Sequence, residues 1–318
     1  MIELRSYRAN DAAGLAAVWS ECFSGQPNFV DIAEVDLRRR VFEQPAFDSA
    51  GIVVAAAGDE IAGFVHFGPR LDLSDDVGTM ETRKGEGHIY AVAAPDFEHA
   101  LTADLIDLAQ TRLLKNGARR ILLGPSWRFG AQPYYSCIAG AYELPGFSPQ
   151  REGLMEAAAD LGFLPAAEYG TPELDLTERN SLSRLAEMAD ALWRRVGGML
   201  RQRIDRLDVP YFPPRLAVAL VSGRKVVAHT AYGRWTEYER QYNRRLYGIT
   251  GVHVARPWRG RGLGKLVLIE ALLSATKDGA EAAHLHVWRG NKPAWNLYHE
   301  ALRFEPKHTW ITLAKTID

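Results

Sequence analysis

Apolar and polar positions change their spacing several times along the chain, and these changes predict its secondary structure. Alternating or continuous short apolar runs predict strands, whereas apolar residues at helical spacing predict helices. The strands are expected at residues 2–8, 51–57, 61–67, 216–221, 226–232, 249–254 and 283–287. Helices are expected at residues 11–23 and 266–275, and one or two more at residues 183–208.

Parts of this pattern recur at an offset of 162 residues. Ala91-Val92-Ala93-Ala94-Pro95 resembles His253-Val254-Ala255-Arg256-Pro257, and Lys115-Asn116-Gly117-Ala118 resembles Lys277-Asp278-Gly279-Ala280. A constant offset is typical of duplication, and the alternative is chance similarity of short apolar segments. We therefore predict two domains, residues 1–170 and 171–318. The segment Leu174-Asp175-Leu176 is compatible with either domain.

Composition and charge narrow the class of protein. The 318 residues are 47% hydrophobic, enough for two packed cores, and the formal net charge is −1. A near-neutral chain disfavours a general nucleic-acid or membrane-surface binder, and no segment approaches the ~20 apolar residues of a membrane span. The two cysteines form neither a disulfide framework nor a zinc motif. We therefore expect a cytoplasmic protein, monomeric or homodimeric, without a bound metal.

A basic, glycine-rich loop follows the predicted strand 249–254 and leads into a predicted helix. Its cations are Arg256, Arg259, Arg261 and Lys265, and its glycines are Gly260, Gly262 and Gly264. Glycines allow successive backbone N–H groups to converge, and a helix start adds donors and a positive dipole end. The spacing matches neither the Walker A loop nor the dinucleotide motif. The loop is therefore predicted to bind another phosphate-bearing ligand, or to be only a basic turn.

The spacing Arg-x-x-Gly-x-Gly, from Arg259 to Gly264, resembles the pyrophosphate loop of the GNAT superfamily of N-acetyltransferases. The downstream pattern Asn-x-x-Ala-x-x-x-Tyr, from Asn291 to Tyr298, is similar to the next part of the same family. Arg303 stands before Phe304 where the family often has glycine. The resemblance implies an α/β (α+β) protein with two tandem GNAT-like domains, each a mixed, mostly antiparallel sheet flanked by helices.

The same resemblance implies acetyl-CoA as co-substrate and assigns the residues that bind it. These are Val252, His253, Val254, Arg259, Gly260, Arg261, Gly262, Leu263, Gly264, Lys265 and Asn291. Tyr298 is the implied general acid for the leaving thiolate, and the alternative is a packed core aromatic. The general base is open among His229, Glu237, Glu239, His253, His286 and water. His284 and His286 share a strand face, but two histidines alone make a weak metal site.

The first copy differs where the coenzyme would bind. Phe97, Ala100 and Thr102 occupy the positions of Arg259, Gly262 and Gly264, and Asp96 and Glu98 add negative charge. We therefore expect one coenzyme site, in the C-terminal domain. The first copy also carries about twenty extra residues, roughly 126–149. These include Ser126-Trp127-Arg128-Phe129 and Tyr134-Tyr135, side chains that would suit an acceptor cleft.

Together these features predict an acyl-CoA-dependent N-acyltransferase that acetylates an amine of a small molecule or peptide, with the C-terminal domain catalytic. Mycothiol synthase shares the tandem architecture, and the similarity to it is one of architecture only. The alternative from another class is a non-enzymatic acyl-CoA-binding regulatory module. The acceptor amine is not identified by the sequence.

Overall fold

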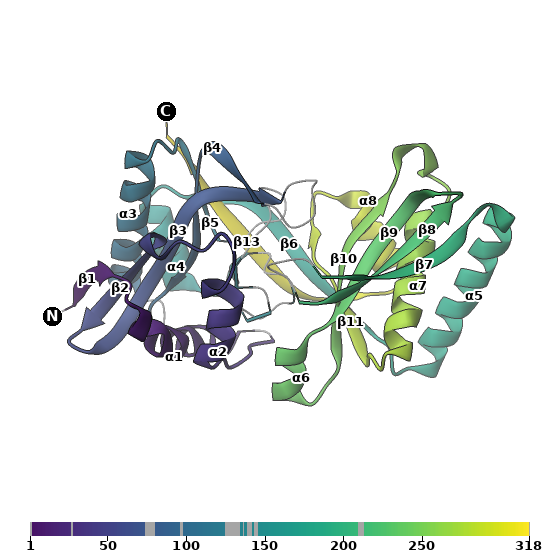
Figure 1. Ribbon diagram of the computed structural model, residues 1–318, viewed down its shortest axis with the longest axis horizontal. Coiled ribbons are helices and arrows are strands. Elements are labelled where there is room, and N and C mark those ends of the chain that lie inside the picture. Colours follow the sequence, from purple (N-terminus) through teal and green to yellow (C-terminus); the bar gives the residue numbers. More distant parts are fainter. Residues whose placement is uncertain are drawn as a thin grey trace. The chain divides into compact units, whose positions relative to one another are not determined.

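The computed structural model describes residues 2–26, 28–73, 80–95, 98–124, 134–135, 137–138, 142, 146–208 and 213–317 (Figure 1). Contacts divide the chain into two compact units, Met1–Tyr169 with His308–Asp318, and Gly170–Lys307. In each unit a mixed, mostly antiparallel sheet is flanked by helices, which confirms the predicted fold class. The loop residues Asp96 and Phe97 and the segment 126–129 lie outside the described residues.

The first unit has the strand order β1-β2-β3-β4-β5-β13, in which β4 and β5 run parallel. Its strands are β1 (Glu3–Ser6), β2 (Ile52–Ala57), β3 (Glu60–Leu73), β4 (Met80–Ala93), β5 (Arg120–Leu123) and β13 (Glu305–Thr316). Its helices include α1 (Ala12–Phe23), α2 (Glu34–Leu37), α3 (His99–Lys115) and α4 (Glu152–Asp160), with a short 3-10 turn, η3 (Ser49–Gly51). The predicted hairpin around Gly58-Asp59 is the β2–β3 pair, and β3 runs six residues further than predicted.

The second unit has the order β6-β11-β10-β9-β8-β7, in which β10 and β11 run parallel. Its strands are β6 (Leu164–Asp175), β7 (Arg201–Leu207), β8 (Arg215–Ser222), β9 (Lys225–Arg234), β10 (Leu246–Val254), β11 (Ala282–His284) and β12 (Val287–Trp288). Its helices and helical turns include α5 (Arg179–Val196), η5 (Gly197–Met199), α6 (Thr236–Tyr242), η6 (Arg256–Trp258), α7 (Leu263–Lys277), α8 (Lys292–Asn296) and η7 (Leu297–Ala301).

Two predicted elements of the second unit are wrong in part. Residues 201–207, predicted as helix, form strand β7 and pair in full with β8. Gly197 and Gly198 end the helix before them, and the apparent helical spacing of Ile204 and Leu207 is incidental in an exposed edge strand. The predicted strand 283–287 is interrupted, because β11 ends at His284 and β12 pairs with β6.

The division of the chain also differs from the predicted domains. Residues 308–318, which include most of β13, belong to the first unit. Leu313 pairs with Leu123 and Thr316 with Arg120, so the strand completes the sheet at β5. In the opposite direction, β6 begins in the first unit, and its end pairs with β11 in the second through Leu174↔Ala283. The segment Leu174-Asp175-Leu176 therefore lies in the second unit.

Each unit has its own hydrophobic core. In the first, α1 and α3 pack against β3 and β4; in the second, α7 packs against β8–β10 and α5 packs against α7. Helix α7 is apolar on most of its surface, with Leu266, Val267, Leu268 and Ile269 all fully buried. Such a helix is held firmly on its sheet, and this fixes the loop from which it starts. Within the described residues, no helix is long and apolar enough to cross a membrane.

Candidate functional site

Strand β10 leaves the parallel ladder halfway along its length. Its pairing with β11 ends at Gly248↔His284, and β10 continues to Val254 while it pairs with β9 on the other side. A bulge interrupts the β9 pairing between Thr250 and His253, where Gly251 has φ +63°. Past Gly248, the edge of β10 that had faced β11 has no strand partner within the described part of the chain. An extended ligand can hydrogen-bond to the backbone along such an edge.

The basic loop begins where β10 ends. Gly260 has φ +76° and Gly262 has φ +81°, in the left-handed region that side chains disfavour, so both positions require glycine. Arg259 donates from Nε to the carbonyl of Val254 at 3.0 Å and ties the loop back to the strand. The Arg261 guanidinium lies 5.0 Å from the centre of the Trp258 ring. Two of the four cations are therefore oriented by the loop itself.

Helix α7 begins directly after these glycines. Gly262 is its N-cap and offers no side-chain acceptor to the first-turn N–H groups. A Cβ at Gly264 would lie 3.4 Å from Val254, and one at Gly262 would lie 3.0 Å from Leu192 of α5. The helix start therefore lies close to both β10 and α5. None of Arg256, Arg259, Arg261 and Lys265 forms an ion pair with a carboxylate of the described residues.

A small cavity of about 190 Å³ adjoins this loop. It is lined by the loop residues Trp258, Gly260 and Arg261, by Leu263, and by Arg195, Val196 and Met199 at the end of α5. Arg195 thus adds a cation beside the four that the sequence analysis named. The loop, the helix start and these cations form one positively charged concave surface, which suits a di- or triphosphate group.

Asn291 and Tyr298 lie on the α8–η7 segment. Asn291 caps α8, and its Oδ1 accepts a hydrogen bond from the Ala294 N–H at 3.3 Å. Tyr298 is 7% exposed and belongs to the hydrophobic core of the second unit, with its ring 6.1 Å from that of Phe304. Both residues therefore have structural roles, and their roles toward a coenzyme stay predictions.

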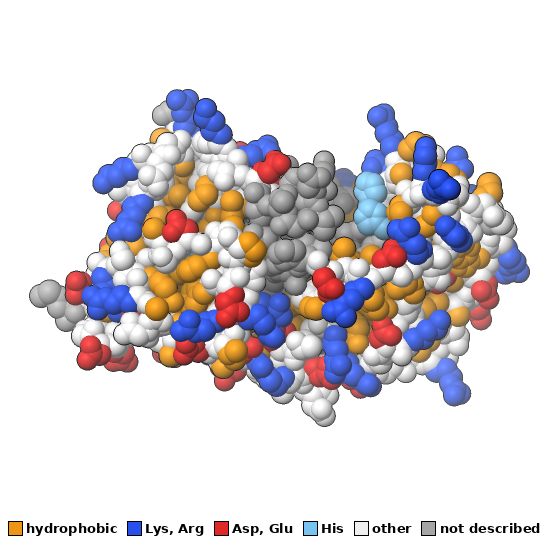
Figure 2. Space-filling model, in the orientation of Figure 1, with side chains coloured by type: hydrophobic (Ala, Val, Ile, Leu, Met, Phe, Trp, Pro, Cys, Tyr) orange, Lys and Arg blue, Asp and Glu red, His pale blue; other side chains and the backbone are white. Residues whose placement is uncertain are grey.

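The candidate bases are spread over the two ends of β10. His229 and His253 lie opposite each other on β9 and β10, next to the loop, with ring centres 5.2 Å apart and planes at 28°. Figure 2 shows histidine side chains gathered at one place on the visible face of the second unit. Desolvation, and then the neighbouring His253, lower the pKa of His229. His229 is therefore favoured in its neutral form, which can accept a proton.

The two glutamates lie at the other end of β10. Glu239 pairs with Arg234, which is opposite Tyr247. Tyr247 and Val254 are seven positions apart along the strand, or roughly 23 Å. Glu237 is 1% exposed on the same short helix, α6. The structure therefore brings neither glutamate to the loop.

His284 and His286, the other two histidines named in the sequence analysis, lie beside β6 and α6. His286 contacts the Thr171 hydroxyl through Nδ1 at 2.7 Å, and His284 is buried with its ring 5.3 Å from that of Trp235. Across the described ranges, no group of three or more His, Cys, Asp or Glu side chains has metal-binding geometry.

Sequence reasoning missed a cavity in the first unit. It is lined by His66, Tyr90 and Tyr134, of which only Tyr134 had been named. A signal was present in Gly68, which directly follows the predicted strand 61–67, and in Gly85 and Gly87, which the structure places in β4, since glycines in strands often mark bulges.

Residues 185–304 match the model of the acetyltransferase (GNAT) family. No curated protein matches the sequence. A tandem GNAT protein from the clavulanic acid biosynthesis pathway is 14% identical, with 99% of this chain and 98% of that chain covered and a TM-score of 0.67. A GCN5-related N-acetyltransferase from Sphaerobacter thermophilus is 14% identical, with 99% and 95% covered and a TM-score of 0.59.

A third similar structure is a glucosamine N-acetyltransferase region in a fungal multi-domain β-N-acetylglucosaminidase. It is 14% identical with a TM-score of 0.63, and this chain, covered to 99%, spans 38% of that longer protein. At these identities the structures show a shared fold. The family match covers the loop and the α8–η7 segment, so residues 185–304 form a domain of the acetyltransferase (GNAT) family.

Proposed function

We propose that this protein is an acyl-CoA-dependent N-acyltransferase that moves an acetyl group from acetyl-CoA to an amine of a small molecule or peptide. The proposal assigns catalysis to the second unit. The observation that carries it is the β10–α7 junction. There, two positive-φ glycines and a helix start lie at the end of β10, inside the GNAT match. Among the described residues, the cations of this junction have no carboxylate partner, and the adjoining edge of β10 has no strand partner.

The proposed binding mode follows from this geometry. The loop N–H groups and Arg256, Arg261 and Lys265 would hold the pyrophosphate, since charge-assisted hydrogen bonds are the stronger class. The backbone of Val252 to Val254 would bind the extended pantetheine arm as an added strand does. In this binding mode the thioester would lie along β10, away from the loop and toward the interior of the second unit.

Acyl transfer then needs a proton acceptor for the amine, a donor to the oxyanion and a proton for the leaving thiolate. A backbone N–H of β10 is suited to the oxyanion, and the pair His229–His253 to removal of the amine proton, directly or through water. Tyr298 is the proposed donor to the thiolate. The name of one similar structure, a glucosamine N-acetyltransferase region, is an example of amine acetylation. The acceptor of this chain stays open.

The test is release of free thiol from acetyl-CoA with pooled amines, amino acids and aminoglycosides as acceptors. We expect turnover with at least one pool, and its loss in Gly262→Asp. Gly223→Asp is the matched control, because Gly223 also has positive φ, at +59°, and lies in the β8–β9 turn. Tight CoA binding with no thiol release from any pool would favour the non-enzymatic acyl-CoA-binding module. Absence of CoA binding would refute both.

A further inference from the structure

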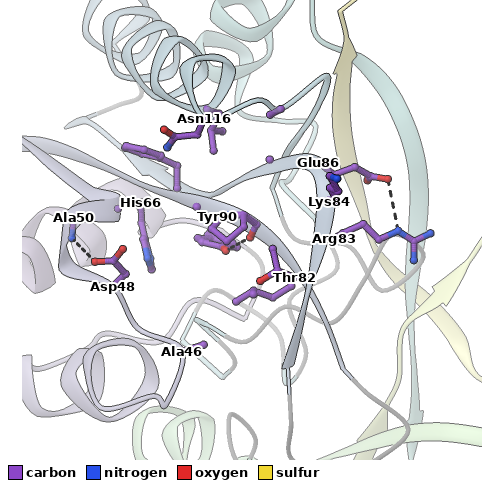
Figure 3. Close-up of a pocket in the computed structure, with 18 of the residues that line it drawn as sticks. Ala46, Asp48, Ala50, His66, Thr82, Arg83, Lys84, Glu86, Tyr90 and Asn116 are labelled. Atoms are coloured by element: carbon purple, nitrogen blue, oxygen red, sulfur yellow. Dashed lines mark hydrogen bonds and ion pairs between the residues drawn. The ribbon is translucent and has the colours of Figure 1, made fainter.

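The first unit contains a cavity of about 700 Å³ (Figure 3). It is lined by β3, β4, the end of α3 and the segment before β2, with Leu113 and Asn116 from the helix. The end of α3 lies away from the β4–α3 junction, which is the position that the basic loop has in the second unit. This cavity is therefore separate from the first unit's own strand-to-helix junction, and its size is that of a small-molecule site.

An irregularity of the β3–β4 pair forms the cavity. Pro69 pairs with Gly87, but the next pair is Leu71 with Thr82, so residues 83–86 of β4 have no partner on β3. Gly85 has φ +76° and accepts a hydrogen bond from the Arg119 N–H at 2.8 Å, which fixes the displaced segment. A Cβ at Gly68 would lie 3.1 Å from the Tyr90 hydroxyl, so that glycine makes room for the ring.

Three rings form one wall of the cavity. The ring centres of His66, Tyr90 and Tyr134 lie 4.7 to 5.0 Å from one another. The Tyr90 hydroxyl donates to the Pro69 carbonyl, and the Tyr134 hydroxyl donates to the Ala46 carbonyl at 2.6 Å. These bonds fix both phenol rings, so the wall is a preformed surface for stacking or edge contact with another planar ring.

His66 supplies a directional polar group in this wall. Its side chain is 1% exposed, and its Nδ1 lies 3.0 Å from the Tyr135 hydroxyl. Burial lowers the pKa of His66 to about 3, so the ring is neutral at pH 7. The buried Tyr135 hydroxyl needs an acceptor and finds it in Nδ1, which places the proton of His66 on Nε2. Within the described residues Nε2 has no partner, so it is a donor for an oxygen of a ligand.

The rim of the cavity is charged. Arg83, Lys84, Asp48 and Glu86 line it, and Glu86 is held by Arg70 at 2.7 Å, with Arg120 at 3.8 Å. Asp48 accepts from the Ala50 N–H at 2.9 Å. Lys84 is exposed and forms no ion pair with a described carboxylate. The charged residues that line the cavity are two cations, Arg83 and Lys84, and two acids, Asp48 and Glu86. Arg83 pairs with Asp72 and Glu86. Lys84 is therefore the lining cation without a carboxylate partner among the described residues, and it favours a single negative charge on the ligand.

We propose that the first unit is a binding domain for a small planar aromatic monocarboxylate. The ring would lie against His66, Tyr90 and Tyr134, a ring oxygen would accept from His66 Nε2, and the carboxylate would lie at the rim beside Lys84. This function is independent of the acyl transfer proposed for the second unit.

The test is titration calorimetry of the full-length chain with 6-hydroxy-2-naphthoate. We expect one site per chain. We also expect weaker binding, by roughly 3- to 10-fold, for 2-naphthol, which lacks the carboxylate, and for cyclohexanecarboxylate, which lacks the planar aromatic rings and the hydroxyl group. Lys84→Ala should remove the difference between naphthoate and naphthol. His66→Phe, which keeps a ring but removes the donor, should weaken naphthoate binding by roughly 3- to 10-fold.

Two tryptophan variants distinguish this cavity from other sites. Thr82→Trp would fill the cavity from its rim and should abolish binding, whereas Glu81→Trp, the neighbouring exposed strand position that does not line it, should leave binding unchanged. Gly262→Asp should also leave naphthoate binding unchanged. No heat of binding at millimolar naphthoate, equal effects of the two tryptophans, or loss of binding in Gly262→Asp would each overturn the proposal.

Discussion

The two strand-to-helix junctions of this chain share a framework and differ in chemistry. In both units a long strand pairs in parallel with its neighbour for a few residues, then continues beyond it and leads into a buried helix. In the second unit, the helix cap is Gly262 with φ +81°, and the flanking side chains are cations. In the first unit, the cap of α3 is Glu98 with φ −46°.

The charge at the two helix starts is opposite. Glu98 places a carboxylate at the positive end of α3, where it complements the helix dipole and repels a phosphate. Counted from the two helix caps, Ala100 takes the place of Gly264, and the fully buried Thr102 takes the place of Leu266. The structure therefore shifts the predicted correspondence of Thr102 with Gly264 by two residues. The charge at the helix start therefore differs between the two units, while the packing that holds each helix lies elsewhere.

The largest effect expected concerns Tyr298. Tyr298→Phe should keep CoA affinity within a few-fold and lower kcat by about 10²- to 10⁴-fold, since it removes the proposed proton donor. Tyr247→Phe is the matched control, because Tyr247 is similarly buried and lies at the far end of β10. Steady-state kinetics with an identified acceptor would measure both. Unchanged turnover in Tyr298→Phe would leave Tyr298 as a core aromatic.

The next effect concerns the loop directly. Gly262→Asp would force a side chain into a left-handed backbone, press it against Leu192 and place a negative charge among the phosphate donors. We expect CoA to bind roughly 10- to 150-fold more weakly by calorimetry. The Gly223→Asp control carries the same backbone strain in a distant turn. If both variants bind CoA as the unsubstituted chain does, the loop is only a basic turn.

A smaller effect concerns the pH dependence of stability, which depends on two buried histidines in the core of the first unit. Burial lowers the pKa of His66 to about 3 and that of His88 to about 4 in the first unit, against 6.5 for an ordinary histidine. The unfolded chain therefore binds more protons below about pH 6.5, so stability falls as pH drops from 6.5 toward 4. Each histidine contributes up to about 1.4 kcal/mol per pH unit.

Urea unfolding midpoints at pH 7, 6 and 5 would measure this slope. His88→Gln keeps a donor for the Gly124 carbonyl and should reduce the slope by roughly half, because His66 still contributes, whereas His99→Gln, at an exposed site, should leave the slope unchanged. A slope that is unchanged in His88→Gln would show that His88 does not take up the proton.

The smallest expected effect concerns the number of CoA molecules bound per chain, which should be one and not two. Titration of the chain with CoA should give a stoichiometry near one, and Gly262→Asp should remove that site without revealing another. Two equivalent sites would show that the first unit binds CoA despite Glu98. The full chain is needed for this measurement, because residues 1–170 alone lack β13.

The sequence predicted the elements whose signals are local. The hairpins and the helix after the basic loop follow from turn residues and apolar spacing. The negative charge at the strand-to-helix junction of the first unit follows from the residue types there. It did not predict the pairings that depend on distant partners. Nothing local in residues 201–207 shows that β8 is their partner, and nothing in residues 308–318 shows that they pair with β5. The cavity beside His66 was missed for the same reason, since a strand irregularity opens it and residues 46 to 134 line it.

The return of β13 to the first unit bears on how the chain folds. Residues 308–316 are synthesised after the whole second unit, so until then the β5 edge of the first sheet has no partner. Exposed strand edges invite pairing with other chains, and contacts between residues far apart in sequence form slowly. The first unit is therefore expected to reach its final form only after β13 has been synthesised, with its open edge as the point most exposed to aggregation or to chaperones.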